Sequence, residues 1–186
     1  TIETNELEDP RFSGNPPARC YYCKQELFGK LRRIADQEGI PFVLDASNLD
    51  DCQDYRPGRR AARELGVRSP LIEAGLTKCA VRLLSRKMGL PTWDMPSMAC
   101  LASRFPYGEA ITREKLRRVD RAESLLRDMG FDQVRVRSHD RLARIEVDPG
   151  RVQEFAQEDL LREVVKRLKD LGFVYVTVDL AGYRSG

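Results

Sequence analysis

The chain has 186 residues, of which 41% are hydrophobic and 33% are charged, so it can bury a core as one large domain or two small ones. No apolar run approaches the roughly 18 residues of a membrane helix, and no signal-peptide pattern is present, which favours a cytoplasmic protein without a membrane span. The net charge of +3 is too small to indicate nucleic-acid binding by itself, although a local basic site for a small phosphorylated ligand stays open.

The first half of the chain predicts helices that alternate with a strand. Apolar residues at helical spacing and the glycines that end each run define the elements. They are an irregular lead-in at 1–18, a helix at 24–38, a strand at 41–47 (PFVLDAS), a polar loop at 48–58, and helices at 59–66 and 77–89. This alternation favours an α/β domain at 1–92 that contains a partial doubly wound parallel sheet.

The second half predicts a separate, smaller domain. The stretch LPTWDMPSMACLASRFPYG holds three prolines and no clean period, so residues 93–110 are interpreted as an ordered junction loop. The elements expected after it are a helix at 112–129, strands at 133–137 and 142–147, a helix at 151–170 and a strand at 173–179. A β-hairpin between two helices is typical of a small α+β domain of ferredoxin-like type, here at 111–186.

The chain contains five cysteines, an odd number without a secretory context, which indicates reduced thiols. Only Cys20 and Cys23, in RCYYCK, are closely spaced, and a Cys-x-x-Cys pair fits a redox site, half a zinc site or half an iron–sulfur site. No second pair of ligands exists, and His139 is the only histidine. Cys100 in the junction loop is the candidate third ligand. Three thiolates would leave one coordination position of a tetrahedral zinc or a four-iron cluster without a protein ligand. The alternative is that Cys100 is an ordinary loop cysteine and the pair is incidental.

The loop DASNLDDCQDYRPG is a second candidate site. Its polar residues follow a predicted parallel strand, where open α/β sheets bind ligands. Carboxylates there would suit Mg²⁺ held with nucleotide phosphates, and an arginine would suit the phosphate itself. The candidate residues are Asp45, Asn48, Asp51, Asp54 and Arg56. A turn rich in Asp and Asn for backbone reasons is the alternative.

A third candidate site lies on the predicted hairpin. Arg135 and Arg137 alternate with valines and therefore share one sheet face, with Glu146 and Arg144 of the next strand beside them. Two arginines so spaced would suit a phosphate or carboxylate, although most polar sheet faces are simply solvated. Glu123 falls beside the apolar stripe of its helix, which favours a carboxylate in a cleft over a solvated one, with a paired structural Glu as the alternative.

Four stretches of this sequence resemble the LarE family of ATP-dependent sulfur transferases, which belong to the PP-loop (N-type ATP pyrophosphatase) superfamily. The stretches are RCYYCK, DYRPGRRAARELGVRSPLIEAGLTK, GLPTWDMPSMACLASRFPYG and GFVYVTVDLAGYRSG. The resemblance implies that ATP adenylylates a carboxylate of pyridinium-3,5-biscarboxylic acid mononucleotide. A sulfur donor then displaces AMP and leaves a thiocarboxylate, a step towards the nickel-pincer nucleotide of lactate racemase.

The resemblance also implies roles for individual residues. One branch of the family uses a single cysteine that gives up its own sulfur, whereas the other has three cysteines and bears a [4Fe–4S] cluster; Cys20, Cys23 and Cys100 match the second branch. The implied catalytic residues are Cys100, Arg104 and Glu123, the implied substrate-binding residues are Ser103, Arg135, Arg137 and Glu146, and the region from Asp45 to Arg56 matches the nucleotide side. The family precedent implies a homo-oligomer. Cys52 and Cys79 match no family motif.

One family feature is missing from the sequence. The PP-loop SGGxDS, whose backbone amides hold the pyrophosphate of ATP, has no counterpart, since RFSGNPP lacks the second Gly and the Asp-Ser. The expectation is that the chain is truncated and lacks the N-terminal part of the catalytic domain. Two rival hypotheses remain, a PP-loop tRNA thiolase and a non-enzymatic interaction domain stapled by zinc or a cluster.

Overall fold

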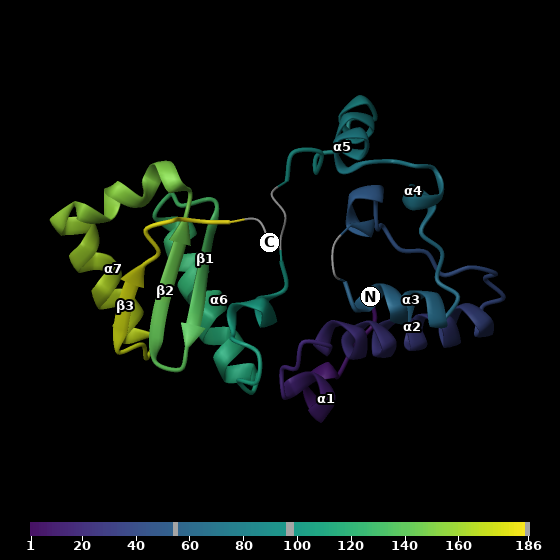
Figure 1. The fold of residues 1–186 in the computed structure, drawn as a ribbon, viewed down its shortest axis with the longest axis horizontal. Helices are drawn as coiled ribbons and strands as arrows, with labels where there is room; N and C mark the ends of the chain where they lie inside the picture. Colours follow the sequence, from purple (N-terminus) through teal and green to yellow (C-terminus); the bar gives the residue numbers. More distant parts are fainter. Residues whose placement is uncertain (54–55, 96–98, 185–186) are drawn as a thin grey trace. The chain divides into compact units, whose positions relative to one another are not determined.

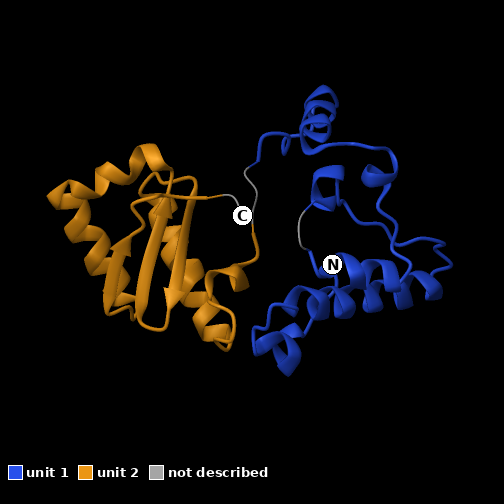
Figure 2. Cartoon of the chain, viewed as in Figure 1, with its two compact units in different colours: residues 1–97 blue, residues 98–186 orange. Residues whose placement is uncertain are grey.

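The computed structural model describes residues 1–53, 56–95 and 99–184. The chain divides into two compact units, Thr1–Ser97 and Met98–Gly186, here called unit 1 and unit 2 (Figure 2). The division falls within the stretch 93–110, for which a junction was predicted. Each unit has a hydrophobic core of its own, and each is described by itself.

Unit 1 is helical in the described residues (Figure 1). Its elements are η1 (Glu6–Glu8), α1 (Pro10–Ser13), α2 (Arg19–Gln37), η2 (Leu49–Cys52), α3 (Gly58–Glu64), α4 (Pro70–Glu73) and α5 (Lys78–Lys87). The core lies where α3 packs on α2, with Phe28, Ala35 and Ala62 buried against Val43 and Val67. The predicted helices at 59–66 and 77–89 are confirmed, and Thr77 caps α5 by accepting the Ala80 N–H at 3.2 Å.

Three predictions for unit 1 were wrong in detail. The lead-in is partly helical, since it forms η1 and α1, and Asp9 caps α1. Helix α2 begins at Arg19, five residues before the predicted start, so the thiol pair lies inside it. The segment 41–47 forms no extended strand in the described chain, because its only ladder contact is an isolated parallel bridge between Leu44 and Arg68.

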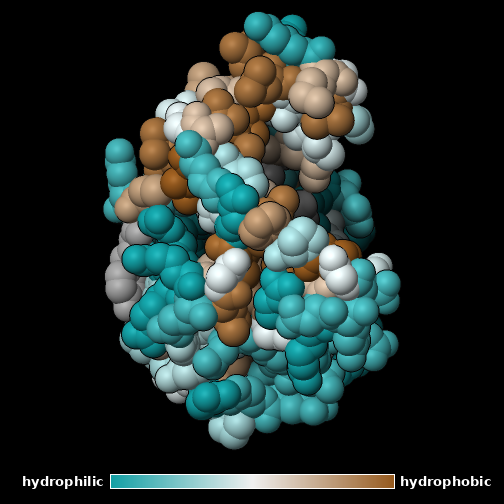
Figure 3. All heavy atoms as spheres, turned by 90° about the vertical axis from the view of Figure 1, so that its right-hand side faces the viewer, coloured by the Kyte–Doolittle hydropathy of each residue, from teal (hydrophilic) through white to brown (hydrophobic). Residues whose placement is uncertain are grey.

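Most of the exposed large hydrophobic side chains belong to unit 1. Leu44, which forms the isolated bridge, is 55% exposed, Phe42 two residues before it is 52% exposed, and Met88 at the end of α5 is 74% exposed. Figure 3 shows hydrophobic residues, coloured brown, at the molecular surface. The described residues of unit 1 do not build the doubly wound sheet that we predicted. The protein is still of mixed α/β type, because unit 2 contains a three-stranded sheet.

Unit 2 is a three-stranded sheet with helices against one face (Figure 1). Its elements are η3 (Leu101–Arg104), α6 (Arg113–Asp128), β1 (Val134–His139), β2 (Leu142–Val147), η4 (Pro149–Ala156), α7 (Glu158–Asp170) and β3 (Tyr175–Val178). The strand order is β1-β2-β3, with β1 and β2 antiparallel and β2 and β3 parallel. The predicted hairpin between two helices is confirmed.

The core of unit 2 explains which sheet face meets the helices. Val136 and Ile145 face each other across β1 and β2 and pack with Leu126 of α6 and Leu168 of α7, all fully buried. Because side chains alternate along a strand, the intervening residues of β1 and β2 lie on the opposite face. That face carries Arg135, Arg137, Arg144 and Glu146.

The predicted single helix at 151–170 is two elements. Gln157 has an extended backbone (φ −72°, ψ 123°), which ends η4 and precedes α7. The break lets Phe155 turn into the core, where its ring stacks on Phe131 at 5.0 Å between centroids. None of the helices in the three described ranges is long and apolar enough to cross a membrane.

Candidate functional site

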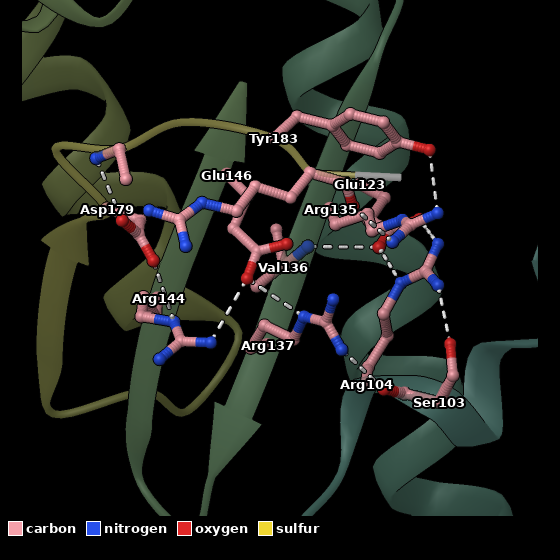
Figure 4. A network of polar contacts seen from close by, with 12 residues as sticks. Ser103, Arg104, Glu123, Arg135, Val136, Arg137, Arg144, Glu146, Asp179 and Tyr183 are labelled. Carbon is pink, nitrogen blue, oxygen red and sulfur yellow. Dashed lines mark hydrogen bonds and ion pairs between the residues drawn. The ribbon is translucent and has the colours of Figure 1, made fainter. Parts of the chain in front are cut away.

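An arginine-rich network lies on the open face of the unit 2 sheet (Figure 4). In the β1–β2 register Arg135 is opposite Glu146 and Arg137 is opposite Arg144. Arg137 Nε donates to Glu146 Oε1 at 2.9 Å, and Arg144 Nη2 donates to the same oxygen at 3.1 Å. The Glu146 side chain is only 6% exposed, so one buried carboxylate holds two guanidinium groups in place.

A second buried carboxylate joins the network from α6. Glu123 accepts from Arg104 Nε at 2.6 Å and from Arg104 Nη2 at 3.1 Å, which is a bidentate pair. Its oxygens also accept the backbone N–H of Val136 at 2.9 Å and a bond from Arg127 at 3.3 Å. Glu123 lies beside the apolar stripe of α6 because its carboxylate is buried and accepts hydrogen bonds from two arginines and a backbone N–H.

Ser103 connects the two carboxylate-centred groups. Its hydroxyl accepts from Arg104 Nη1 at 2.9 Å, and its carbonyl oxygen accepts from Arg137 Nη1 at 2.9 Å. Ser103 and Arg104 belong to η3, whose first turn is closed by a bond from the Ser103 N–H to the Cys100 carbonyl at 2.9 Å. The structure therefore brings together the residues to which the family resemblance gave catalytic roles (Arg104 and Glu123) and substrate-binding roles (Ser103, Arg135, Arg137 and Glu146).

The network carries more positive than negative charge. Four guanidinium groups, those of residues 104, 135, 137 and 144, surround the carboxylates of Glu123 and Glu146, while Arg144 also pairs with Asp179 at 3.6 Å. The pKa of Arg135 is lowered from its ordinary value, chiefly by burial and further by repulsion from Arg104 and Arg137. A bound anion would relieve this repulsion, so the site is suited to a phosphate or carboxylate group.

Tyr183 is a member of this network that the sequence did not point to, as are Arg127 and Asp179. Its hydroxyl accepts from Arg135 Nη2 at 2.6 Å, and the Arg135 guanidinium lies 4.2 Å from the centre of its ring. The carbonyl of Arg184 accepts from the other terminal nitrogen of Arg135 at 3.3 Å. The sequence signal was weak, because GYRSG follows the last strand and carries no periodic pattern.

The thiol pair of unit 1 lies near the start of α2. Cys20 and Cys23 are one helical turn apart, Cys20 is exposed, and the Cys23 sulfur lies 4.0 Å from Glu6 Oε1. Gly58, the first residue of α3, lies beside them, since a Cβ on Gly58 would lie only 3.3 Å from the Cys20 carbonyl oxygen. A glycine at this position thus allows α3 to approach the turn that bears the thiols.

The candidate nucleotide-binding residues form a compact set of turns. Asp45 accepts from the Ser47 N–H and hydroxyl, and Asn48 and Asp51 form a capping box on η2. Arg56 pairs with Asp51 at 2.9 Å. Hydrogen bonds of this kind stabilise the turns themselves, so they leave the predicted nucleotide role untested. Asp54 lies outside the described residues.

Comparison with known proteins identifies relatives over nearly the whole chain. The chain is 52% identical over 185 residues to an uncharacterized protein of Synechocystis sp., covering 100% of this chain and 69% of that protein. It is 41% identical over 180 residues to the pyridinium-3,5-bisthiocarboxylic acid mononucleotide synthase of Lactiplantibacillus plantarum, covering 97% of this chain and 64% of the synthase. The chain belongs to the LarE family.

A more distant relative of this LarE-family chain is an uncharacterized protein of Methanocaldococcus jannaschii, 30% identical over 171 residues, with coverage of 92% of this chain and 66% of that protein. No protein-family model matches. The chain thus spans about two thirds of the length of these relatives.

The thiols of this LarE-family chain fit the donor set of an iron–sulfur cluster. None of the five cysteines, all of which lie in the described ranges, is part of a disulfide, and the candidate ligands are Cys20 and Cys23 of unit 1 and Cys100 of unit 2. Within the described part of either unit, no three His, Cys, Asp or Glu side chains gather in a metal-binding arrangement.

Proposed function

We propose that the protein is an ATP-dependent sulfur transferase that acts on pyridinium-3,5-biscarboxylic acid mononucleotide in the synthesis of the nickel-pincer nucleotide. The carboxylate of the substrate attacks the α-phosphorus of ATP and releases pyrophosphate, and a sulfide donor then displaces AMP to leave a thiocarboxylate. The proposal is supported by 41% identity to a synthase whose name specifies a pyridinium bisthiocarboxylic acid mononucleotide.

The observation that carries this proposal is the cationic network of unit 2. Arg137 and Arg135 would hold the phosphate of the mononucleotide, while Glu146 and Glu123 fix the guanidinium groups around it. A phosphate monoester carries up to two negative charges, and the guanidinium groups of this network outnumber its carboxylates even when Asp179 is counted.

Cys100 is joined to this network by η3. The thiol belongs to the residue that caps η3, and Ser103 and Arg104 of the same turn bond to Arg137 and Glu123. A substrate held by its phosphate at the arginines would therefore be bound by the same short turn that presents the Cys100 thiol. Arg104 would add a positive charge near the carboxylate that reacts.

The cluster of the three-cysteine branch is part of the proposal. Cys20, Cys23 and Cys100 would hold a [4Fe–4S] cluster, which when bound offers an iron without a protein ligand to an added sulfide. The exposure of Cys20 and Cys100 leaves both thiols accessible to a shared ligand. The sulfide donor is then external, and the enzyme keeps its cysteines through many turnovers.

Unit 1 would supply the nucleotide side. Asp45, Asn48, Asp51 and Arg56 would bind ATP and Mg²⁺ in a domain of PP-loop type. The parallel bridge between Leu44 and Arg68 is the kind of contact that two neighbouring strands of such a sheet make. Phe42 and Leu44 are exposed here, whereas in a doubly wound sheet neighbouring strands and helices would cover such side chains.

The test uses the full-length protein prepared without oxygen. It is supplied with ATP, Mg²⁺, sulfide and pyridinium-3,5-biscarboxylic acid mononucleotide, and the products are measured by mass spectrometry. We expect one AMP and one pyrophosphate for each thiocarboxylate formed, over several turnovers. Thiolation of tRNA under the same conditions, with no product from the mononucleotide, would contradict the proposal.

A further inference from the structure

The chain after β3 turns back onto the open face of the sheet. We call residues Asp179–Arg184 the strap. The Asp179 N–H donates to the Ile145 carbonyl at 2.8 Å, and the Tyr183 N–H donates to the Val147 carbonyl at 2.6 Å. The backbone of the strap is thus hydrogen-bonded to two residues of β2, Ile145 and Val147.

Gly182 brings the strap close to the chain that leaves β2. Its φ of +68° lies in the left-handed region, which favours glycine. A Cβ there would lie 2.8 Å from the Val147 carbonyl oxygen and 2.9 Å from Pro149 Cα, both backbone atoms. No other residue fits without moving the backbone, so the position of Tyr183 is set by the strap itself.

The strap accepts hydrogen bonds from both terminal nitrogens of Arg135. Nη2 donates to the Tyr183 hydroxyl at 2.6 Å, Nη1 donates to the Arg184 carbonyl at 3.3 Å, and the guanidinium lies against the Tyr183 ring (Figure 4). Both partners are neutral, and among the described residues Arg135 forms no hydrogen bond or ion pair with Glu123 or Glu146. The other three arginines of the network each bond to Glu123 or Glu146.

This difference gives Arg135 a distinct place in the site. A guanidinium held by neutral oxygens keeps its full positive charge for a ligand, whereas one held by a carboxylate is largely neutralised. Each terminal nitrogen also retains a second N–H beyond the one given to the strap. A fixed side chain loses less conformational freedom on binding than a mobile one.

We propose that Tyr183 is a positioning residue of the anion site, which orients Arg135 for the phosphate of a pyridinium mononucleotide. This inference rests on the proposed function for the identity of the ligand. It assigns Tyr183 an effect on binding that acts through Arg135 alone.

A double-mutant cycle in the full-length protein tests the inference. The variants are Tyr183→Phe, Arg135→Ala and the two combined, and calorimetry measures the affinity for two probes, inorganic phosphate and nicotinic acid mononucleotide. Tyr183→Phe should weaken both about tenfold, as expected for one bond to a charged group. In the Arg135→Ala background the same change should have no further effect. The unfolding midpoint should stay the same, because the ring and the backbone bonds of the strap remain.

The control is Tyr175→Phe, which removes an exposed phenol from β3 of the same unit and should leave both affinities unchanged. Equal or tighter binding by Tyr183→Phe overturns the inference, as does an equal loss in the Arg135→Ala background. Arg137→Ala separates the two proposals: if it weakens binding while Tyr183→Phe does not, the role of Tyr183 fails and the anion site stands. A wild-type protein that binds neither probe overturns both.

Discussion

Arg104 and Glu123 form a bidentate ion pair whose side chains are only 6% and 2% exposed. The pair links η3 to α6 across 19 positions of the sequence, and the same carboxylate takes the backbone N–H of Val136 in β1. Three elements of unit 2 therefore meet at one buried carboxylate. Loss of that group would leave a buried guanidinium and a backbone N–H without their acceptor.

Glu123→Ala should destabilise the protein by about 3–5 kcal/mol, because breaking a buried ion pair exposes the remaining charge to a low-dielectric interior. Chemical denaturation followed by circular dichroism measures the change. Glu163→Ala is the matched control, since Glu163 makes a surface pair with Arg167 on α7 and should cost at most about 0.5 kcal/mol. Similar losses for the two variants would show that the Glu123 network contributes little.

Arg135→Ala and Arg137→Ala should each weaken binding of the mononucleotide substrate by about 1.5–3 kcal/mol, the range for a hydrogen bond to a charged group. The unfolding transition should move little, because Arg144 still pairs with Glu146 when Arg137 is removed, and Arg135 bonds only to neutral oxygens. Arg141→Ala, an exposed arginine at the turn of the same hairpin, serves as the control. Unchanged affinity in both variants would rule out the phosphate role of this pair.

Changing Cys20, Cys23 or Cys100 to Ala should remove the visible absorption of a cluster from anaerobically prepared full-length protein and abolish sulfur transfer. Cys52→Ala and Cys79→Ala should do neither. The single-cysteine mechanism predicts a different pattern, in which only Cys100 matters and the protein loses the mass of H₂S after one turnover. Zinc at one per chain, in place of iron and sulfide, would favour a structural staple.

Two glycine substitutions should change stability in opposite directions. Gly182→Ala should destabilise by more than about 1 kcal/mol, because alanine is strained at φ +68° and its Cβ meets backbone atoms. Gly29→Ala should stabilise by about 0.5–1 kcal/mol, since Gly29 lies inside α2 and a Cβ there meets nothing within 4 Å. Thermal unfolding measures both, and a destabilised Gly29→Ala variant would contradict the helix assignment.

The sequence predicted those elements whose signals are local. Alternating valines and arginines defined β1, and apolar residues at helical spacing with a following glycine defined α5. It failed where the deciding interaction is distant in sequence. Segment 41–47 has the composition of a strand, but a strand needs a partner, and among the described residues only Arg68 supplies one. The start of α2 was missed because Ala18 provides no side-chain cap.

The site was predictable to the extent that it follows sheet alternation. The shared face of Arg135, Arg137 and Glu146 required only the period of two along each strand. The pairing of Arg104 with Glu123 depends on how η3 docks on α6, which no local pattern encodes, and those residues were placed by family resemblance. Tyr183 depends on a tight turn after β3, so it became visible only in the folded unit.

The bond from Val136 to Glu123 also affects how unit 2 can associate with other chains. Strand β1 is an outer strand of the sheet, and the Val136 N–H points away from β2. An outer strand normally offers such donors to any extended peptide that approaches it. Because a buried side chain already occupies this donor, an incoming strand would have to displace the Glu123 carboxylate and with it the Arg104 pair. Unit 2 is thereby protected at β1 against sheet extension and the aggregation that it promotes.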